Sequence, residues 1–295
     1  MGRLISDKFK QWEEECQERF DTLKANEEEL NRIFIEIYGL QDELTPEVAD
    51  KDVTVRLANL QREIKSLISY IIGLNLGRYS LEEEGLVYAG GVFDWSKYKT
   101  IIPDIDNIIP ICDDEYFEDD LCGKVINSIK KIYGEDTLEE NLQFIANALG
   151  GNGTSREILR NYLLNDFYND HLKIYQKRPI YWMLDSGKKN GVKALIYKHR
   201  YTPDLLAKIR TDYVHEQQER YRTQIENLDN ELLHLDGLNK VKVAKKLEKI
   251  KGQAEELLVF EEKLHHLSDQ MISIDLDDGV VVNYAKFKEI LYKIK

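Results

Sequence analysis

The sequence has few of the residues on which common metal and disulfide sites depend. Only three cysteines occur in 295 residues, and no CxxC pair is present. An odd number of widely spaced cysteines argues against a disulfide framework and a zinc site, and it favours free thiols in a reducing cytoplasm. The six histidines also lack metal-ligand spacing. We therefore expect no bound metal and a cytoplasmic location.

Proline is equally scarce, and its placement excludes one familiar catalytic loop. The five prolines are never adjacent, so no Asn-Pro-Pro-aromatic methyltransferase loop is present. The glycine run at residues 150–153 lacks the Lys-Ser/Thr with which a P-loop holds phosphate and magnesium. Residues 275–279 lack the alternating oxygens of a calcium loop. We therefore assign no catalytic residue and no cofactor to this chain.

Long apolar runs are absent as well. The longest one, at residues 67–76, is interrupted by Ser69, Gly73 and Asn75, and it is too short to span a bilayer. Charged residues make up 32% of the chain and hydrophobic residues 42%, proportions that are typical of a globular protein. We expect no membrane partner.

Acidic and basic residues are segregated along the chain. The formal net charge of −13 counts against nucleic-acid binding as the only role. However, residues 104–120 hold eight acids and no base, whereas residues 173–200 hold eight bases and one acid. Local patches, and not the total charge, determine binding. We interpret the acidic run as a solvated or partner-facing surface, with metal binding as a less favoured alternative.

Apolar periodicity predicts a mainly α fold, a helical domain with an inserted β-hairpin and a long antiparallel coiled-coil hairpin. One helix is expected over residues 8–24, and Asn26 is expected to cap a second that ends at Gly39. A strong apolar stripe follows at residues 57–72. Further helices are predicted over residues 121–133, 137–149 and 155–176, the last beginning with a capping box at Thr154 and Glu157.

The remaining elements are a β-hairpin, the coiled coil and a tail. Residues 179–184 and 192–197 read as two strands joined by a turn that ends in Asn190-Gly191. Heptad spacing then predicts two helices, to about residue 235 and on to residue 271, that form an antiparallel hairpin of roughly 45 Å. The tail reads as a strand near residues 280–282 and a closing helix. We expect four segments, namely residues 1–80, 81–202, 203–272 and 273–295.

Basic residues alternate with aromatic ones around the predicted β-hairpin. Cations can contact phosphates, and rings can stack on sugars or bases. The candidate phosphate contacts are Lys173, Lys177, Arg178, Lys188, Lys189, Lys193, Lys198 and Arg200. Tyr181 and Trp182 would stack or support the hairpin. The alternative is a hairpin whose aromatic residues are core and whose lysines are only solvated.

Several long strings resemble the C-terminal region of the PglX family, the adenine-specific DNA methyltransferases of BREX phage-defence systems. The strings are LKANEEELNRIFIEIYGLQDELTPEV (23–48), SYIIGLNLGRYSLEEEGLVYAGG (69–91), DNIIPI (106–111), YQKRPIYWMLDSGKKNGVKALIYKHRY (175–201) and LDDGVVVNYAKF (276–287). The family is related to type IIG restriction–modification enzymes, in which one chain carries a methyltransferase core, a target-recognition region and helical spacers.

This resemblance implies that the chain is part of a larger enzyme that uses AdoMet (S-adenosylmethionine). The AdoMet-binding and catalytic motifs belong to an upstream methyltransferase core and have no match here. We therefore expect a non-catalytic module that engages double-stranded DNA and positions the target. The alternative is a scaffold, in which the acidic run and the coiled coil dock other BREX subunits or the enzyme's own core.

Overall fold

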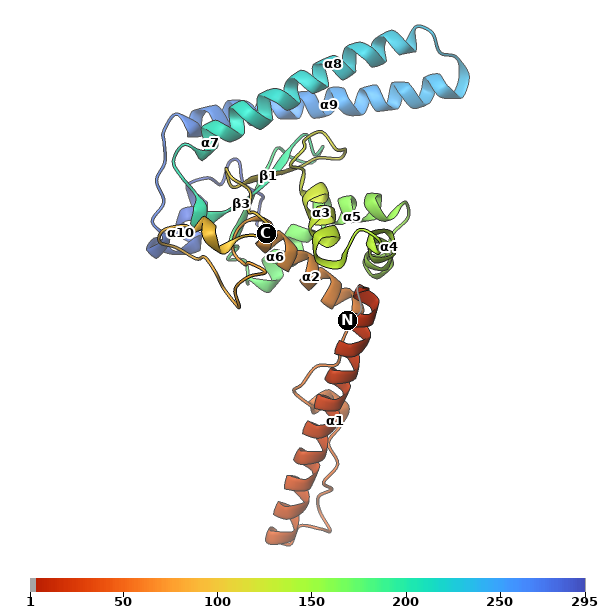
Figure 1. The fold of residues 1–295 in the computed structure, drawn as a ribbon, viewed down its shortest axis with the longest axis vertical. Coiled ribbons are helices and arrows are strands. Elements are labelled where there is room, and N and C mark those ends of the chain that lie inside the picture. Colours follow the sequence, from red (N-terminus) through yellow and green to blue (C-terminus); the bar gives the residue numbers. More distant parts are fainter. Residues whose placement is uncertain (1–3, 295) are drawn as a thin grey trace.

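The computed structural model describes residues 4–294 and shows a mainly α fold around a small sheet. A helical body encloses the sheet, and two long helical arms extend from it (Figure 1). One arm is α1 (Ile5–Tyr38), and the other is the pair α8 (His215–Leu232) and α9 (Gly237–Ser268). Within residues 4–294, every helix is too short or too polar to cross a membrane.

The sheet has three antiparallel strands, one more than the predicted hairpin supplies. The strands β2 (Tyr181–Asp185) and β3 (Lys193–Tyr197) form that hairpin, and β1 (Ile108–Ile111) pairs with the other edge of β3. The spatial order is therefore β1-β3-β2. The acidic surroundings of β1 concealed this strand, whose Pro110 is tolerated because β1 lies at an edge of the sheet.

Both faces of the sheet are buried, each under its own layer of helices. Tyr181 and Leu195 pack with α2 (Leu60–Asn75), α3 (Leu121–Tyr133), α4 (Leu138–Leu149), α5 (Ser155–Asn165) and α6 (Phe167–Ile174). Trp182 and Ile196 pack with α7 (Leu205–Lys208), α8 and α9. Because adjacent strand residues point to opposite faces, the hairpin joins the two cores.

Local sequence signals account well for the helices of the body. The helix α3 has the predicted bounds, and Asp120 caps it by accepting from the amides of Cys122 and Gly123. Thr154 and Glu157 form the predicted capping box at the start of α5. The predicted helix over residues 155–176 is wrong in one respect, because it breaks at Asp166 into α5 and α6.

The structure corrects the prediction at both ends of the chain. The helix α1 is continuous, so Asn26 lies inside it and caps nothing, although Gly39 ends it in a left-handed conformation as predicted. The predicted strand near residues 280–282 is instead part of α10 (Gly279–Ala285). Val281 and Val282 stay exposed there, with no strand edge beside them.

The predicted closing helix is also wrong, since a turn follows α10 and leads to a short extended bridge. Leu291 pairs with Leu184 on the free edge of β2. The amide of Tyr292 donates to the carbonyl of Met183 at 2.8 Å. These backbone bonds offset the loss of helical ones and fix the C-terminal residues on the sheet.

The two helices of the α8–α9 arm pack antiparallel as predicted, and they do so within one chain, which heptad spacing alone leaves open. Tyr221 and Leu228 of α8 and Leu247, Ile250 and Leu257 of α9 are buried at the predicted heptad positions. The root of the arm begins with α7 and a π-helical turn at Ile209–Val214. The hydroxyl of Tyr201 donates to the carbonyl of Ile272 at 2.9 Å, so the two ends of the arm meet.

Candidate nucleic-acid interface

The structure divides the predicted basic residues into exposed and buried groups. Lys173, Lys177, Arg178, Lys188 and Lys189 are exposed, and for them DNA contact stays a prediction. The other members of the set lie mostly in the interior of the fold.

Lys193 and Lys198 are buried, which contradicts their assignment as phosphate contacts. The ammonium of Lys193 donates to the carbonyl of Leu164 at 2.9 Å, and only 5% of the residue is exposed. Lys198 is 8% exposed. Burial lowers the pKa of both side chains, because a charged ammonium is costly away from water. These two lysines are therefore part of the folded interior.

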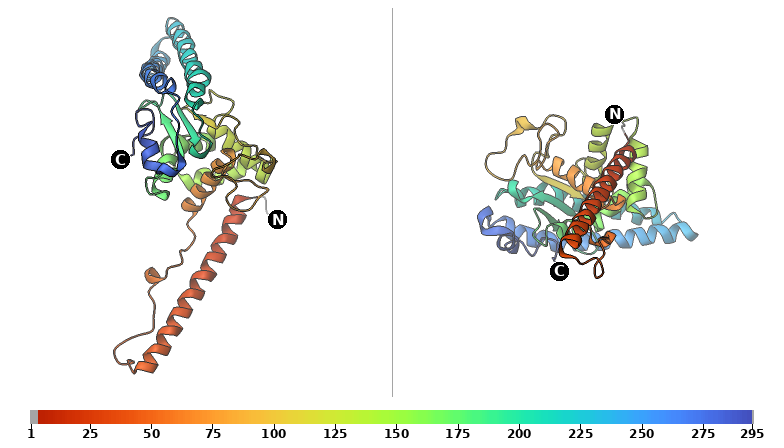
Figure 2. Two further views of the ribbon diagram at one scale, coloured as in Figure 1. Left: turned by 90° about the vertical axis from the view of Figure 1, so that its left-hand side faces the viewer. Right: turned by 90° about the horizontal axis from the view of Figure 1, so that it is seen from below.

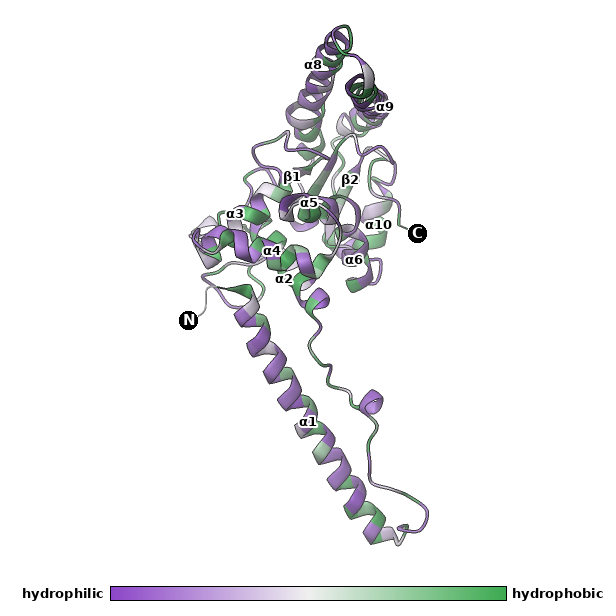
Figure 3. Ribbon diagram, turned by 90° about the vertical axis from the view of Figure 1, so that its right-hand side faces the viewer, coloured by the Kyte–Doolittle hydropathy of each residue, from purple (hydrophilic) through white to green (hydrophobic). Residues whose placement is uncertain are grey.

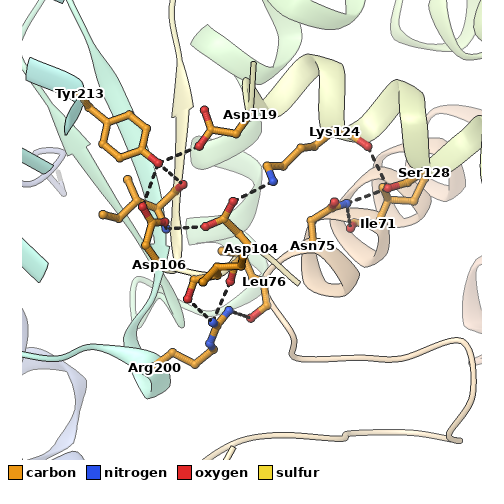
Figure 4. Close-up of polar contacts among 12 residues, drawn as sticks. Ile71, Asn75, Leu76, Asp104, Asp106, Asp119, Lys124, Ser128, Arg200 and Tyr213 are labelled. Carbon is orange, nitrogen blue, oxygen red and sulfur yellow. Dashed lines mark hydrogen bonds and ion pairs between the residues drawn. The ribbon is translucent and has the colours of Figure 1, made fainter. Parts of the chain in front are cut away.

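Arg200 is also used within the chain, where it holds three backbone segments together. Its guanidinium donates to the carbonyls of Leu76 at 3.2 Å, Asp104 at 2.7 Å and Ile105 at 3.2 Å (Figure 4). The same group lies 4.4 Å from the ring centre of Phe93. With its donors engaged in this way, Arg200 does not face a phosphate, and the prediction is wrong for this residue.

Tyr181 and Trp182 support the hairpin from inside and cannot stack on bases. Each is 1% exposed. Tyr181 stacks on His171, whose Nε2 accepts from the Tyr181 amide at 3.3 Å. Burial lowers the pKa of His171 to about 3, so this histidine is neutral and can accept that bond. Of the two roles predicted for the pair, only support is compatible with their positions.

The exposed basic residues gather at opposite ends of the hairpin. Lys173, Lys177 and Arg178 precede β2, whereas Lys188 and Lys189 lie on the turn between the strands. A side chain of α9 holds that turn, because Glu256 accepts from the amides of Lys189 at 2.8 Å and Gly191 at 3.2 Å.

A cleft lies at the first of these ends. It has a volume of about 730 Å³ and lies between α2, α6 and the last residues of the chain. Lys173 and Lys177 line it, together with Lys65 and Lys293, which sequence reasoning missed. The other lining residues are Asp166, Asn169, Asp170, Leu172, Gln176, Tyr292 and Ile294. We call this feature the lysine cleft.

The end of α6 places Lys177 at the rim of the lysine cleft. Gln176 and Lys177 have φ values of 49° and 60°, in the left-handed region that side chains other than glycine rarely adopt. The amide of Lys177 donates to the carbonyl of Leu172 at 2.8 Å, which closes the helix end. The backbone thus turns sharply and leaves Lys177 exposed beside Lys173.

Charge in the lysine cleft is positive on balance. Lys65 pairs with Asp170 at 2.8 Å, and Lys173 lies 3.5 Å from the same residue. Four ammonium groups therefore face two carboxylates, those of Asp166 and Asp170. The hydroxyl of Tyr292 donates to Asn169 at 3.0 Å, which orients one polar wall. Such a site suits an anion, and a phosphodiester above all.

The same features do not suit AdoMet. Cofactors of this size commonly bind at the carboxyl ends of parallel strands, whereas the strands of this sheet are antiparallel. The sulfonium of AdoMet is a cation, which the ammonium groups of the lysine cleft would repel. The lysine cleft therefore does not suit the cofactor.

The acidic run is largely part of the fold, which corrects its interpretation as a solvated or partner-facing surface. Asp120 is 1% exposed and pairs with Arg160 at 2.8 Å. Asp113 pairs with Lys249 of α9. Within residues 4–294, no group of three or more His, Cys, Asp and Glu side chains is arranged to hold a metal ion.

A second acidic cluster ties the root of the α8–α9 arm to the body (Figure 4). The hydroxyl of Tyr213 lies 2.7 Å from a carboxylate oxygen of Asp119 and 3.0 Å from one of Asp106. Asp104 pairs with Lys124 at 2.7 Å. Burial, followed by the neighbouring Asp104, raises the pKa of Asp106 to about 7. Asp106 therefore holds a proton more readily than an exposed carboxyl does.

Comparison with known proteins identifies relatives of the chain by sequence. No protein-family model matches it. It is 50% identical over 283 residues to the adenine-specific methyltransferase PglX of Lacticaseibacillus casei, a match that covers 94% of this chain and 24% of the relative. It is 39% identical over 246 residues to the adenine-specific methyltransferase BrxX of Escherichia coli, covering 79% of this chain and 20% of that protein.

The chain thus spans about a quarter or less of the length of the curated relatives that it matches. Identity at these levels over most of the chain confirms the resemblance drawn from the long strings. By sequence, the chain belongs to the PglX family of adenine-specific methyltransferases, as a segment of such a protein.

Proposed function

We propose that the chain is the non-catalytic C-terminal module of a site-specific adenine DNA methyltransferase in BREX phage defence. It binds double-stranded DNA and positions the target for an upstream methyltransferase core, which binds AdoMet. The observation that carries this proposal is the lysine cleft, where Lys65, Lys173, Lys177 and Lys293 converge from three parts of the chain. The names of the matched relatives support an adenine-bearing nucleic acid as the partner.

The physical basis of binding would be release of counterions from DNA. Each phosphate that a lysine neutralises releases condensed cations, so affinity falls steeply as salt concentration rises. The net charge of −13 weakens long-range attraction, which makes the local cleft more important. Lys188 and Lys189, at the other end of the hairpin, would add a second phosphate contact.

A charge-reversal experiment tests the lysine cleft. We expect the double variant Lys173→Glu and Lys177→Glu to bind a labelled duplex at least about tenfold more weakly near 50 mM salt. The slope of log affinity against log salt should fall by about 2, one unit per lost phosphate contact. Fluorescence anisotropy at several salt concentrations measures both quantities.

The matched control is Lys97→Glu with Lys99→Glu, two exposed lysines on the loop before β1. This control carries the same change in net charge, so a general electrostatic effect would weaken both variants equally. Unchanged affinity and slope in the cleft variant would contradict the proposal. Reversal of Lys188 and Lys189 tests the far end of the hairpin in the same assay.

One observation favours a second candidate function, a scaffold that docks other BREX subunits or the enzyme's own core. The distal half of α1 exposes five large side chains at helical spacing, which we call the α1 stripe. They are Leu30, Ile33, Phe34, Ile37 and Tyr38, with exposed fractions of 43–70%. Contiguous exposed apolar surface often marks a protein contact. The rest of the parent polypeptide is the nearest partner, since the chain spans only part of its relatives.

The two functions give different results in one pair of measurements. A scaffold predicts that the chain co-elutes with the separately purified remainder of the parent, and that Phe34→Glu with Ile37→Glu abolishes this. It also predicts no gel shift by the chain alone. A DNA module predicts a gel shift that these α1 substitutions leave unchanged.

A further inference from the structure

The first half of α9 carries a run of basic residues that the lysine cleft does not include. Residues 240–251 contain six lysines and one acid, Glu248. The run begins near the turn that joins α8 to α9, and this end of the arm projects beyond the body (Figures 1 and 2). The arm therefore presents charge at a distance from the cleft.

Helical spacing collects most of these lysines on one side of α9. Lys242, Lys245, Lys246 and Lys249 follow one another at intervals of i, i+3, i+4 and i+7, which places them on a single face. The adjoining face, with Leu247 buried, packs against α8. All four lysines are exposed, and we call them the lysine stripe.

Most of the lysine stripe lacks an acidic partner in the chain. Lys249 pairs with Asp113 and remains 60% exposed. Within residues 4–294, no ion pair joins a carboxylate to Lys242, Lys245 or Lys246. Other charged residues of the arm do pair within it, for example Lys251 with Asp229 across the two helices at 3.3 Å.

Such an arrangement is unfavourable for an isolated helix. Like charges three or four residues apart on a helix repel each other, and each lysine of the stripe has two such neighbours within it. The lysine stripe therefore lowers the stability of α9 unless an anion neutralises it.

Its dimensions fit the backbone of a nucleic acid. Seven residues of helix, from Lys242 to Lys249, rise by about 10 Å. Along one strand of duplex DNA this length holds about three phosphates, at roughly 3.4 Å of axial rise each. The surrounding residues 237–251 contain no aromatic side chain that could stack on a base. The contact would thus be to phosphates and independent of base sequence.

We propose that the lysine stripe is a second DNA site, which binds the phosphodiester backbone of a duplex outside the lysine cleft. This inference rests on the proposed function only in taking duplex DNA as the ligand. The lysine stripe increases the affinity for any duplex, whereas the cleft lies on a different part of the fold. An acidic protein segment is the rival ligand for the same face.

The experiment replaces three of the lysines and measures the affinity for duplexes of unrelated sequence. We expect Lys242→Glu with Lys245→Glu and Lys246→Glu to weaken binding at least tenfold for every duplex, and to lower the salt slope by about 3. Arginine at the same three positions preserves charge and should bind as the parent chain does. The matched control reverses Lys51, Lys97 and Lys99, which are exposed elsewhere.

Four outcomes separate this inference from the proposed function. Loss in the stripe variant, with binding kept by the control, supports the second site. Unchanged binding in the stripe variant, with loss in the cleft variant, overturns the second site alone. Unchanged binding in both overturns both proposals. Loss of affinity for a polyglutamate probe, with duplex affinity unchanged, assigns the face to an acidic protein and also overturns the second site.

Folding does not confound this test. Lys242, Lys245 and Lys246 are exposed and lie beyond the first turn of α9, so reversing their charge should change the unfolding temperature little. Circular dichroism and thermal unfolding verify this before any binding is measured. A stripe variant that unfolds early is replaced by the neutral triple change to glutamine, for which the same loss of affinity is expected.

Discussion

The two arms of the molecule are helices of similar length with opposite relations to the body. The helix α1 has 34 residues and α9 has 32. The arm that contains α9 lies across the sheet and buries Leu257 and Phe260 in the second core. In contrast, α1 is rooted in the body mainly through its first turns, where the Ile5 amide donates to Asn141 at 2.8 Å.

Beyond its root, α1 contacts the segment that returns along it, for example where the amide of Val48 donates to Glu28 at 3.1 Å. Residues 40–59 run back beside the helix, and Lys24 pairs with Asp50 at 2.6 Å (Figure 2). Apolar residues remain visible along the arm to its far end (Figure 3). The α1 arm therefore leaves an apolar stripe uncovered, whereas the α8–α9 arm leaves lysines uncovered, together with Leu233, Leu238 and Val241 near its tip. The difference lies in the charge, since an apolar stripe alone suits protein and a cationic face suits phosphate.

The largest effect that tests this comparison is expected in the anchored arm. Leu257 has no exposed surface, and it joins α9 to the core beneath the sheet. Leu257→Ala should lower the free energy of unfolding by about 2–5 kcal/mol, through lost burial and a cavity. Urea unfolding followed by circular dichroism measures this change. A cost below about 1 kcal/mol would mean that the arm is not anchored as described.

An intermediate and pH-dependent effect is expected at the root of that arm, in Asp106→Asn. The folded-state pKa of Asp106, about 7, is above its ordinary value of 3.8. The stability contributed by this proton is complete below the ordinary pKa and is lost as pH rises through 7. Asparagine imitates the protonated acid towards Asp104 and Tyr213. The variant should therefore match the parent chain below about pH 4, and its advantage in stability should grow as pH rises towards 7 and then stay constant.

Thermal unfolding at intervals between pH 5 and 8 tests this sign. The groups around Asp106 are the carboxyls of Asp104 and Asp119, the cations of Lys124, Arg200 and Lys208, and the hydroxyl of Tyr213. Asp119→Asn tests the same sign at a second carboxyl, because the pKa of Asp119 is also raised, chiefly by burial. If the stability advantage of Asp106→Asn over the parent chain shrinks as pH rises, the raised pKa of Asp106 is contradicted.

The smallest effect is expected in the α1 stripe. Phe34 and Ile37 are 53% and 68% exposed, so little burial is lost when they are truncated. Phe34→Ser and Ile37→Ser should each change the free energy of unfolding by less than about 0.5 kcal/mol. A loss as large as that of Leu257→Ala would show that the stripe is covered. Sedimentation at several concentrations would then reveal whether a second copy covers it.

Local signals in the sequence predict much of the fold. Asp120 and Thr154 mark helix starts by capping chemistry, and heptads define the α8–α9 arm. The strand β1 was missed because its pairing with β3 joins residues more than 80 positions apart. The continuity of α1 was missed because Asn26, a good cap, is also tolerated inside a helix.

The candidate site was harder to predict than the fold. The burial of a long charged side chain is difficult to predict, since its apolar stem can be buried while its charged end donates to a backbone carbonyl. The sequence does not reveal that Lys193 donates to Leu164 or that Arg200 holds three segments. Nor does it bring Lys65 and Lys293 to the same cleft, because that convergence follows from tertiary packing.

The bond between Tyr201 and Ile272 has a consequence for how such arms can vary. Because the chain leaves and rejoins the body at one point, the length of the arm can change without moving its points of attachment. Removing one heptad from each helix beyond the buried Ile250 would shorten its reach by about 10 Å, without changing the span between its two roots. The distance at which its tip meets a partner can therefore be set independently of everything beneath it.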